Sequence, residues 1–179
     1  MRCFISIELP KEVTAEIKNI QSDLESKNLF HGSFAKEENL HLTLKFLGEI
    51  SNAQIEKVKL LLNEIKLRKF KASLGSLGIF NTKTPRIFWI SINAQEIHDL
   101  KKEIDETLSK VFPKEKMEFA SHVTIARIKG LEHRQKLLDY PTKNKTKKIE
   151  FFIDKFWLKE STLTPDGPFY KTIEEFTLN

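Results

Sequence analysis

The hydrophobic and polar positions of the chain follow two periodicities. Where apolar residues recur every three or four positions, the pattern predicts an amphipathic helix. Helices are expected at residues 11–27, from the N-cap Ser51 to 65, at 96–112 and at 131–138. Where apolar and polar residues alternate, or β-branched and aromatic residues gather, the pattern predicts a strand. Strands are expected at residues 2–9, 39–48, 70–80, 86–92, 121–127, 149–160 and 169–178.

Turn-forming residues separate these elements. Residues 81–85 and the sequence Thr-Pro-Asp-Gly-Pro at 164–168 each join two predicted strands. Loops are expected at residues 28–38, after Pro113 and in the Lys-rich stretch 141–148. Because the order of helices and strands begins again near the middle, we predict an α+β fold. It is one domain, residues 1–179, of two similar lobes, each an antiparallel sheet with helices on its outer face.

Two of the predicted strands carry the same motif, His-x-Thr-x, at residues 41–44 and 122–125. Residues two apart on a strand share a face, so His41 lies beside Thr43 and His122 beside Thr124. In a chain of this composition, two such matches arise by chance about one time in twenty. The motifs stand about half the chain apart, one in each predicted lobe. We therefore expect the two His–Thr pairs to face each other across a cleft.

Two imidazoles beside two hydroxyls suit acid–base chemistry on a phosphate. An unperturbed histidine has a pKa of about 6.5, so one ring can accept a proton while the other donates one. The hydroxyls of the two threonines can donate to phosphate oxygens. Strict alternation places Lys45 on the face of His41, where it would supply a positive charge. Arg127 would supply one from the other strand, provided that a β-bulge or its long side chain brings it to the motif face, which is the face that carries the His and Thr side chains of the motifs.

Composition narrows the classes of function. The formal net charge of +5 and the pI of about 9.2 mildly favour polyanionic partners such as RNA or nucleotides. The single cysteine, Cys3, rules out a disulfide within the chain and disfavours a metal site built on cysteine. The sequence has no Gly-rich phosphate loop, no nucleophile elbow, no secretory signal and no apolar run of about 20 residues. We expect a cytoplasmic protein with no metal, no cofactor and no membrane contact.

Five segments together resemble the RNA 2′,3′-cyclic phosphodiesterase family. These LigT-like proteins, formerly called 2′-5′ RNA ligases, belong to the 2H phosphoesterase superfamily. The segments are Arg2–Ile7, Asn39–Gly48, Arg86–Trp89, His122–Arg127 and Ser161–Tyr170. One departure is Ser121, where family members commonly have proline.

The resemblance implies a bilobal fold and hydrolysis of RNA 2′,3′-cyclic phosphate ends to 2′-phosphomonoesters without a metal. It implies that His41 is the general acid that protonates the 3′-oxygen and His122 the base that activates water. Thr43, Thr124 and Arg127 would bind the phosphate.

Two alternatives remain open at the level of sequence. The same fold can serve as a non-catalytic module that binds nucleotides or RNA, and 2′-5′ ligation of RNA can occur as a side activity. The aromatic residues Phe4, Trp89 and Tyr170 are expected to pack in the core, although aromatic rings also stack on RNA bases. We expect a monomer that needs no protein partner.

Overall fold

The computed structural model describes residues 1–113 and 118–179 of the chain. Residues 114–117, part of the loop expected after Pro113, lie outside the described residues. The described strands are β1 (Arg2–Glu8), β2 (Phe30–Phe34), β3 (His41–Glu49), β4 (Phe70–Phe80), β5 (Ile87–Asn93), β6 (His122–Leu131), β7 (Glu150–Ile153), β8 (Lys155–Thr164) and β9 (Gly167–Thr177). The helices are α1 (Lys11–Ser26), α2 (Asn52–Leu62), α3 (Gln95–Leu108), α4 (Arg134–Lys143) and the 3₁₀ helix η1 (Glu37–Asn39).

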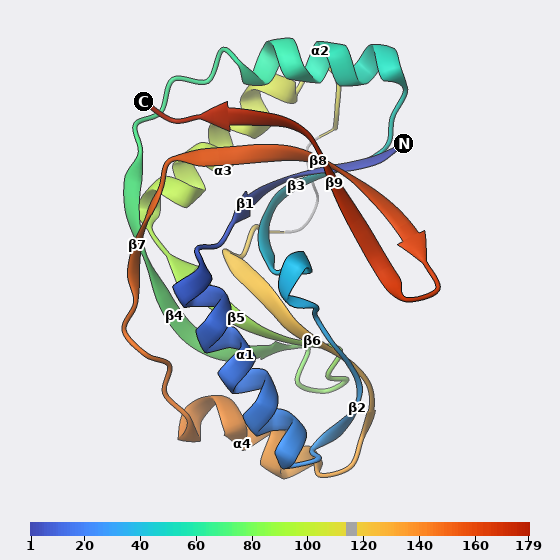
Figure 1. Cartoon of the computed structure of the whole chain (residues 1–179), viewed down its shortest axis with the longest axis vertical. Coiled ribbons are helices and arrows are strands. Elements are labelled where there is room, and N and C mark those ends of the chain that lie inside the picture. The colour runs from blue at the N-terminus through green and yellow to red at the C-terminus, as the bar shows by residue number, and fades with distance from the viewer. Residues whose placement is uncertain (114–117) are drawn as a thin grey trace.

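The described strands form one curled antiparallel sheet (Figure 1). Its order is β7-β4-β5-β6-β3-β1-β8-β9, and β2 pairs with the free part of β6. One half of the sheet, β3, β1, β8 and β9, comes from the two ends of the chain. The other half comes from the middle of the chain, except for β2, which precedes β3. The two halves join where β3 meets β6. The α+β class and the antiparallel sheet are confirmed, and the division into two similar lobes stays a prediction.

The helices cover the sheet in two groups (Figure 1). Helices α2 and α3 pack against each other, and α3 contacts β3. Helix α1 contacts β6, and α4 contacts β4. The predicted N-cap is confirmed, because the Ser51 hydroxyl accepts from the Gln54 amide while the Gln54 side chain accepts from the Ser51 amide. No helix in the described parts of the chain is long and apolar enough to cross a membrane.

The stretch 28–38 was expected to be a loop, and this prediction is wrong. It contains β2, which pairs with β6 over residues 126–131. Five residues without apolar alternation give no strand signal by themselves, so the pairing with β6 decides the conformation. Gly32 permits it, because a Cβ at this position would lie 2.0 Å from the carbonyl oxygen of Arg127.

Several boundaries also differ from the prediction, and strand pairing explains two of them. The single strand expected at residues 149–160 is divided at Asp154 into β7, which pairs with β4, and β8, which pairs with β1. The chain therefore passes here from one half of the sheet to the other. Helix α4 begins later than expected and continues through Pro141, because β6 extends to Leu131. Partners distant in the sequence set both boundaries.

Candidate active site

The two motif strands are neighbours at the centre of the sheet. Strands β3 and β6 run antiparallel, and Leu42 is paired with Val123. Both of these side chains are fully buried and anchor the motifs to the core. Counting outward from this pair sets His41 opposite Thr124 and Thr43 opposite His122. The structure thus brings the two His–Thr pairs together on adjacent strands of one sheet, and not on two separate facing sheets.

A β-bulge in β6 places Arg127 on the motif face. The pairing of β6 with β5 shifts so that Trp89 lies opposite Thr124 while Phe88 lies opposite Ala126, which leaves Ile125 as the extra residue. Ile125 and Ala126 are consequently both buried, and Arg127 is exposed. An extra residue reverses the alternation of side chains beyond it. Arg127 therefore shares a face with Thr124, as a bulge was expected to allow.

Strand β3 has a bulge at the corresponding position, and it removes Lys45 from the motif face. Its pairing with β1 shifts so that Leu44 is the extra residue. Leu44 and Lys45 are both buried, and the Lys45 ammonium donates to Asp105 of α3 over 2.7 Å. The expectation that Lys45 shares a face with His41 is wrong, because strict alternation does not survive the bulge. Phe46 takes that face instead and is 63% exposed.

The imidazole of His41 is oriented through both nitrogens. Its Nδ1 lies 2.7 Å from the carbonyl oxygen of Asn39, and its Nε2 lies 3.0 Å from the hydroxyl oxygen of Thr43. A carbonyl only accepts, so Nδ1 carries the hydrogen and the Nε2 lone pair of the neutral ring accepts from Thr43. The ring also packs against Phe4 and Tyr170, with centroid distances of 5.0 and 5.1 Å.

Asn39 connects this histidine to the β8–β9 hairpin. Its main-chain carbonyl accepts from His41, and its side-chain amide donates to the carbonyl of Pro168 over 2.8 Å. Tyr170, two residues beyond Pro168, lies against the His41 ring. The hairpin is therefore tied to the same residue that fixes the imidazole.

His122 repeats the arrangement on the other strand. Its Nδ1 lies 2.7 Å from the carbonyl oxygen of Ala120, again two residues earlier in the chain. Phe80 packs edge-on against its ring at a centroid distance of 4.8 Å, and the ring of Trp89 is 6.5 Å away. Both histidines thus use Nδ1 for orientation, which leaves Nε2 as the nitrogen for proton transfer.

Burial keeps both imidazoles neutral in the free protein. Burial is the main cause that lowers the pKa of His41 to about 4; the Asn39 carbonyl opposes this effect, and the positive charges of Lys159 and Arg127 add to it. Burial likewise lowers the pKa of His122, and the Ala120 carbonyl opposes this. An anion bound between the rings favours their charged forms. The site is therefore set to take up a proton together with an anionic ligand.

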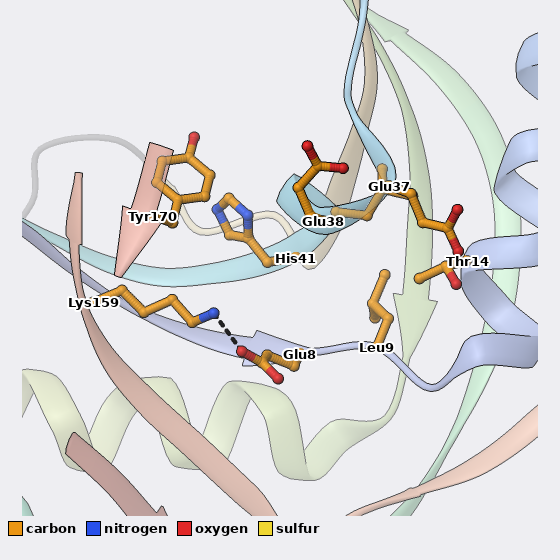
Figure 2. A pocket seen from close by; sticks show the side chains of 9 residues that line it. Glu8, Leu9, Thr14, Glu37, Glu38, His41, Lys159 and Tyr170 are labelled. Carbon is orange, nitrogen blue, oxygen red and sulfur yellow. Dashed lines mark hydrogen bonds and ion pairs between the residues drawn. The ribbon is translucent and has the colours of Figure 1, made fainter. Parts of the chain in front are cut away.

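A pocket of about 210 Å³ opens beside His41 (Figure 2). Tyr170 and Lys159 line it from the hairpin, and Glu8 lines it from the strand position opposite His41. Lys159 is nearly buried and forms an ion pair with Glu8. Lys159, and not Lys45, is therefore the lysine that lies beside His41, and its charge is paired with that of Glu8.

The sequence-based prediction gives no role to several residues of the site, among them Asn39, Phe46 and Lys159. Lys159 lies more than a hundred residues from His41 in the chain, and no local pattern connects the two. Phe46 has a usable signal, since it follows His41 by five positions just as Arg127 follows His122. The remaining histidines are exposed away from the motifs, at positions 31, 98 and 133. Within residues 1–113 and 118–179, no three His, Cys, Asp or Glu side chains gather as metal ligands.

Comparisons with known proteins agree on one family. The family model described as LigT like Phosphoesterase matches residues 7–89. A Methanocaldococcus jannaschii protein named RNA 2′,3′-cyclic phosphodiesterase is 36% identical, and the alignment covers 98% of this chain and 100% of that protein. An Aquifex aeolicus protein of the same name is 34% identical, with coverages of 99% and 97%.

Solved structures share the fold of this chain. The crystal structure of a Thermus thermophilus protein superposes with a TM-score of 0.82 at 26% identity, covering 99% of this chain and 98% of that one. The E. coli LigT structure with 3′-AMP gives a TM-score of 0.80 at 20% identity, covering 99% and 97%. The second match shows the shared fold.

Proposed function

Since the chain belongs to the LigT-like phosphoesterase family, we propose that it hydrolyses 2′,3′-cyclic phosphates at RNA ends by metal-free acid–base catalysis with His41 and His122. Cyclic phosphodiesterase activity itself is supported by full-length similarity to enzymes of that name. The observation that carries the mechanism is the matched orientation of the two imidazoles. Each donates from Nδ1 to a carbonyl two residues earlier and stands beside a threonine on the motif face.

His122 suits the role of general base. Its lowered pKa keeps Nε2 unprotonated near neutral pH. In the proposed step, Nε2 takes a proton from a water molecule while the water oxygen forms the new bond to phosphorus. The bond from phosphorus to the ribose 3′-oxygen breaks at the same time, which leaves a 2′-phosphomonoester.

His41 suits the role of general acid once the anionic substrate is bound. In the free protein its Nε2 accepts from Thr43, and its pKa of about 4 leaves it neutral. The negative charge of the cyclic phosphate raises that pKa, so Nε2 gains a proton. The same protonation frees the Thr43 hydroxyl to donate to the phosphate, and the proton on Nε2 then passes to the 3′-oxygen as it leaves.

Thr43, Thr124 and Arg127 are proposed to hold the phosphate. The two hydroxyls stand on adjacent strands and can each donate to a non-bridging oxygen. The bulge in β6 turns the Arg127 guanidinium to the same face, where its charge offsets that of the transition state. All roles are thereby filled by side chains of the chain itself.

Phe46 is proposed to carry the terminal base. Its exposed ring stands on the motif face, opposite Phe4 in the neighbouring strand, with a centroid distance of 6.4 Å. Stacking on an aromatic ring contributes about 1–3 kcal/mol per base without strong sequence preference. Phe4 itself is buried, as expected from the sequence, and its ring packs against that of Phe46.

The proposal is tested with an oligoribonucleotide that ends in a 2′,3′-cyclic phosphate, in buffer containing EDTA. Hydrolysis by the intact protein should give a 2′-phosphate. His41→Ala and His122→Ala should each lower kcat by about 10²-fold or more, since each removes one proton-transfer group. His98→Ala, which alters an exposed histidine of α3, is the matched control and should retain full activity.

Three outcomes would contradict parts of this proposal. Loss of activity in EDTA would contradict the metal-free mechanism. Full activity in either histidine variant would contradict the paired acid and base. Tight binding of the oligonucleotide without any turnover would support the non-catalytic binding module in its place.

A further inference from the structure

Strand β1 presents a regular row of side chains to the site. Both irregularities in its pairing with β3 arise from extra residues in β3, so β1 itself keeps strict alternation. Phe4 lies opposite Phe46, Ser6 opposite Thr43 and Glu8 opposite His41. By the same alternation, the first residue of the strand, Arg2, faces the side of the sheet that carries the motifs.

The side chain of Arg2 is exposed, and its nearest acidic neighbour in the sheet is already engaged. Arg2 is paired across the strands with Glu49, whose carboxylate lies 3.6 Å from the amino nitrogen of Met1. Within the described parts of the chain, no hydrogen bond or ion pair of the Arg2 guanidinium is found. A cation on the motif face is thus left for an external anion.

Arg2 also stands close to the residues that enclose the catalytic ring. Extending the pairing of β1 with β8 by one residue sets Arg2 opposite Ser161, which is itself paired with Tyr170. Burial raises the pKa of Tyr170, and the charges of Arg127 and Arg2 oppose this rise. Tyr170 is therefore within electrostatic reach of both guanidinium groups, although they come from different halves of the sheet.

The spacing along β1 separates Arg2 from the reacting phosphate. Ser6 marks the position of Thr43, and Arg2 precedes it by four residues, or about 13 Å along the strand. At that separation, with Phe4 between them, the side chains of Arg2 and Thr43 do not bind the same phosphate group. Arg2 lies instead beyond the Phe4–Phe46 pair, where the chain of a longer RNA would continue from the terminal nucleotide.

We propose that Arg2 binds the phosphodiester immediately 5′ of the terminal nucleotide, so that the enzyme prefers oligoribonucleotides to mononucleotides. This inference rests on the proposed function, because it takes the terminal phosphate to lie between the motifs and the terminal base to lie on Phe46. Guanidinium groups suit the task, since their planar donors match two oxygens of one phosphate.

The test compares a substrate that lacks the upstream nucleotides and their phosphodiesters with one that has them. One is cytidine 2′,3′-cyclic phosphate, and the other is a short oligoribonucleotide that ends in the same nucleotide. In Arg2→Gln, KM for the oligoribonucleotide should rise about 5- to 20-fold while kcat stays within twofold. Both constants for the mononucleotide should stay within twofold. Arg68→Gln, which alters an exposed arginine beyond α2, is the matched control and should leave both substrates unaffected.

Salt dependence gives an independent measure of the same contact. The logarithm of the binding constant of a fluorescent oligoribonucleotide is plotted against the logarithm of the salt concentration. The negative slope of this plot should be shallower by about 0.7 in Arg2→Gln than in the intact protein, which is the amount for one phosphate of a single strand. Equal losses on both substrates, or none on either, would overturn the inference. Failure of the intact protein to hydrolyse either substrate would overturn the proposed function, and the binding measurement would still decide the role of Arg2.

Discussion

At the scale of the residue, the chemistry of His41 depends on the groups around its ring. Phe4 and Tyr170 exclude water from the ring, and Lys159 adds a positive charge nearby. Both effects disfavour the imidazolium ion. In the free protein the imidazole is therefore neutral, and its Nε2 accepts from Thr43.

Replacing Lys159 with methionine should raise the pKa of His41. Burial remains the first cause of the lowered value of about 4, but the largest contribution from a charge is removed. Above its pKa the imidazole is mostly neutral, so a higher pKa increases the charged fraction at every pH in that range. A titration of the His41 ring followed by NMR between pH 3 and 8 measures this shift. Lys155→Met, which breaks the ion pair with Glu175 elsewhere on β8, is the control, and coincident titration curves for both variants would refute the effect.

At the scale of the element, the two bulges decide which cations lie on the motif face. The bulge in β3 turns Lys45 into the core, and the bulge in β6 brings Arg127 to the motif face. The same local feature thus has opposite consequences for the two residues. Lys45 ties β3 to α3 through Asp105, which also binds Lys101 over 2.6 Å.

Substitution by methionine should separate these two roles. Lys45→Met should lower the free energy of unfolding by about 1–2 kcal/mol, because Asp105 keeps only one of its two lysine partners. Its kcat/KM should stay within threefold. Arg127→Met should leave the free energy of unfolding within about 0.5 kcal/mol and lower kcat/KM about 100-fold. Denaturant unfolding and steady-state kinetics on both variants decide the matter, and a large kinetic loss in Lys45→Met would place Lys45 at the substrate after all.

At the scale of the whole molecule, His41 and His122 lie where the two halves of the sheet meet. Strands from both ends of the chain form one half, so neither half is a continuous segment. Leu42 and Val123, the residues paired at the junction, are both fully buried. Packing at this junction therefore fixes the distance between the two histidines.

Leu42→Ala should lower the free energy of unfolding by about 3 kcal/mol, since it leaves a cavity in the core at the junction. Unfolding should remain a single transition, because the sheet is continuous across the junction. Leu60→Ala, which shortens a side chain that is 72% exposed on α2, should change stability by less than about 0.5 kcal/mol. Two separate transitions in Leu42→Ala would show that the predicted lobes fold as independent units.

The sequence by itself determined the features that rest on local patterns. The helices, most strands and the positions of the two His-x-Thr motifs follow from side-chain periodicity, which a short window of residues contains. The signal for the catalytic pair was strong because the same four-residue pattern occurs twice.

Only the tertiary structure decided which residues join these motifs at the site. Lys159 and the strand β2 owe their places to partners distant in the chain, and pairing of that kind leaves no local trace in the sequence. The faces of Lys45 and Phe46 depended on one extra residue in β3, which reverses the alternation. A bulge forms when two strands are fitted together across a sheet, so the pattern of either strand alone does not contain it.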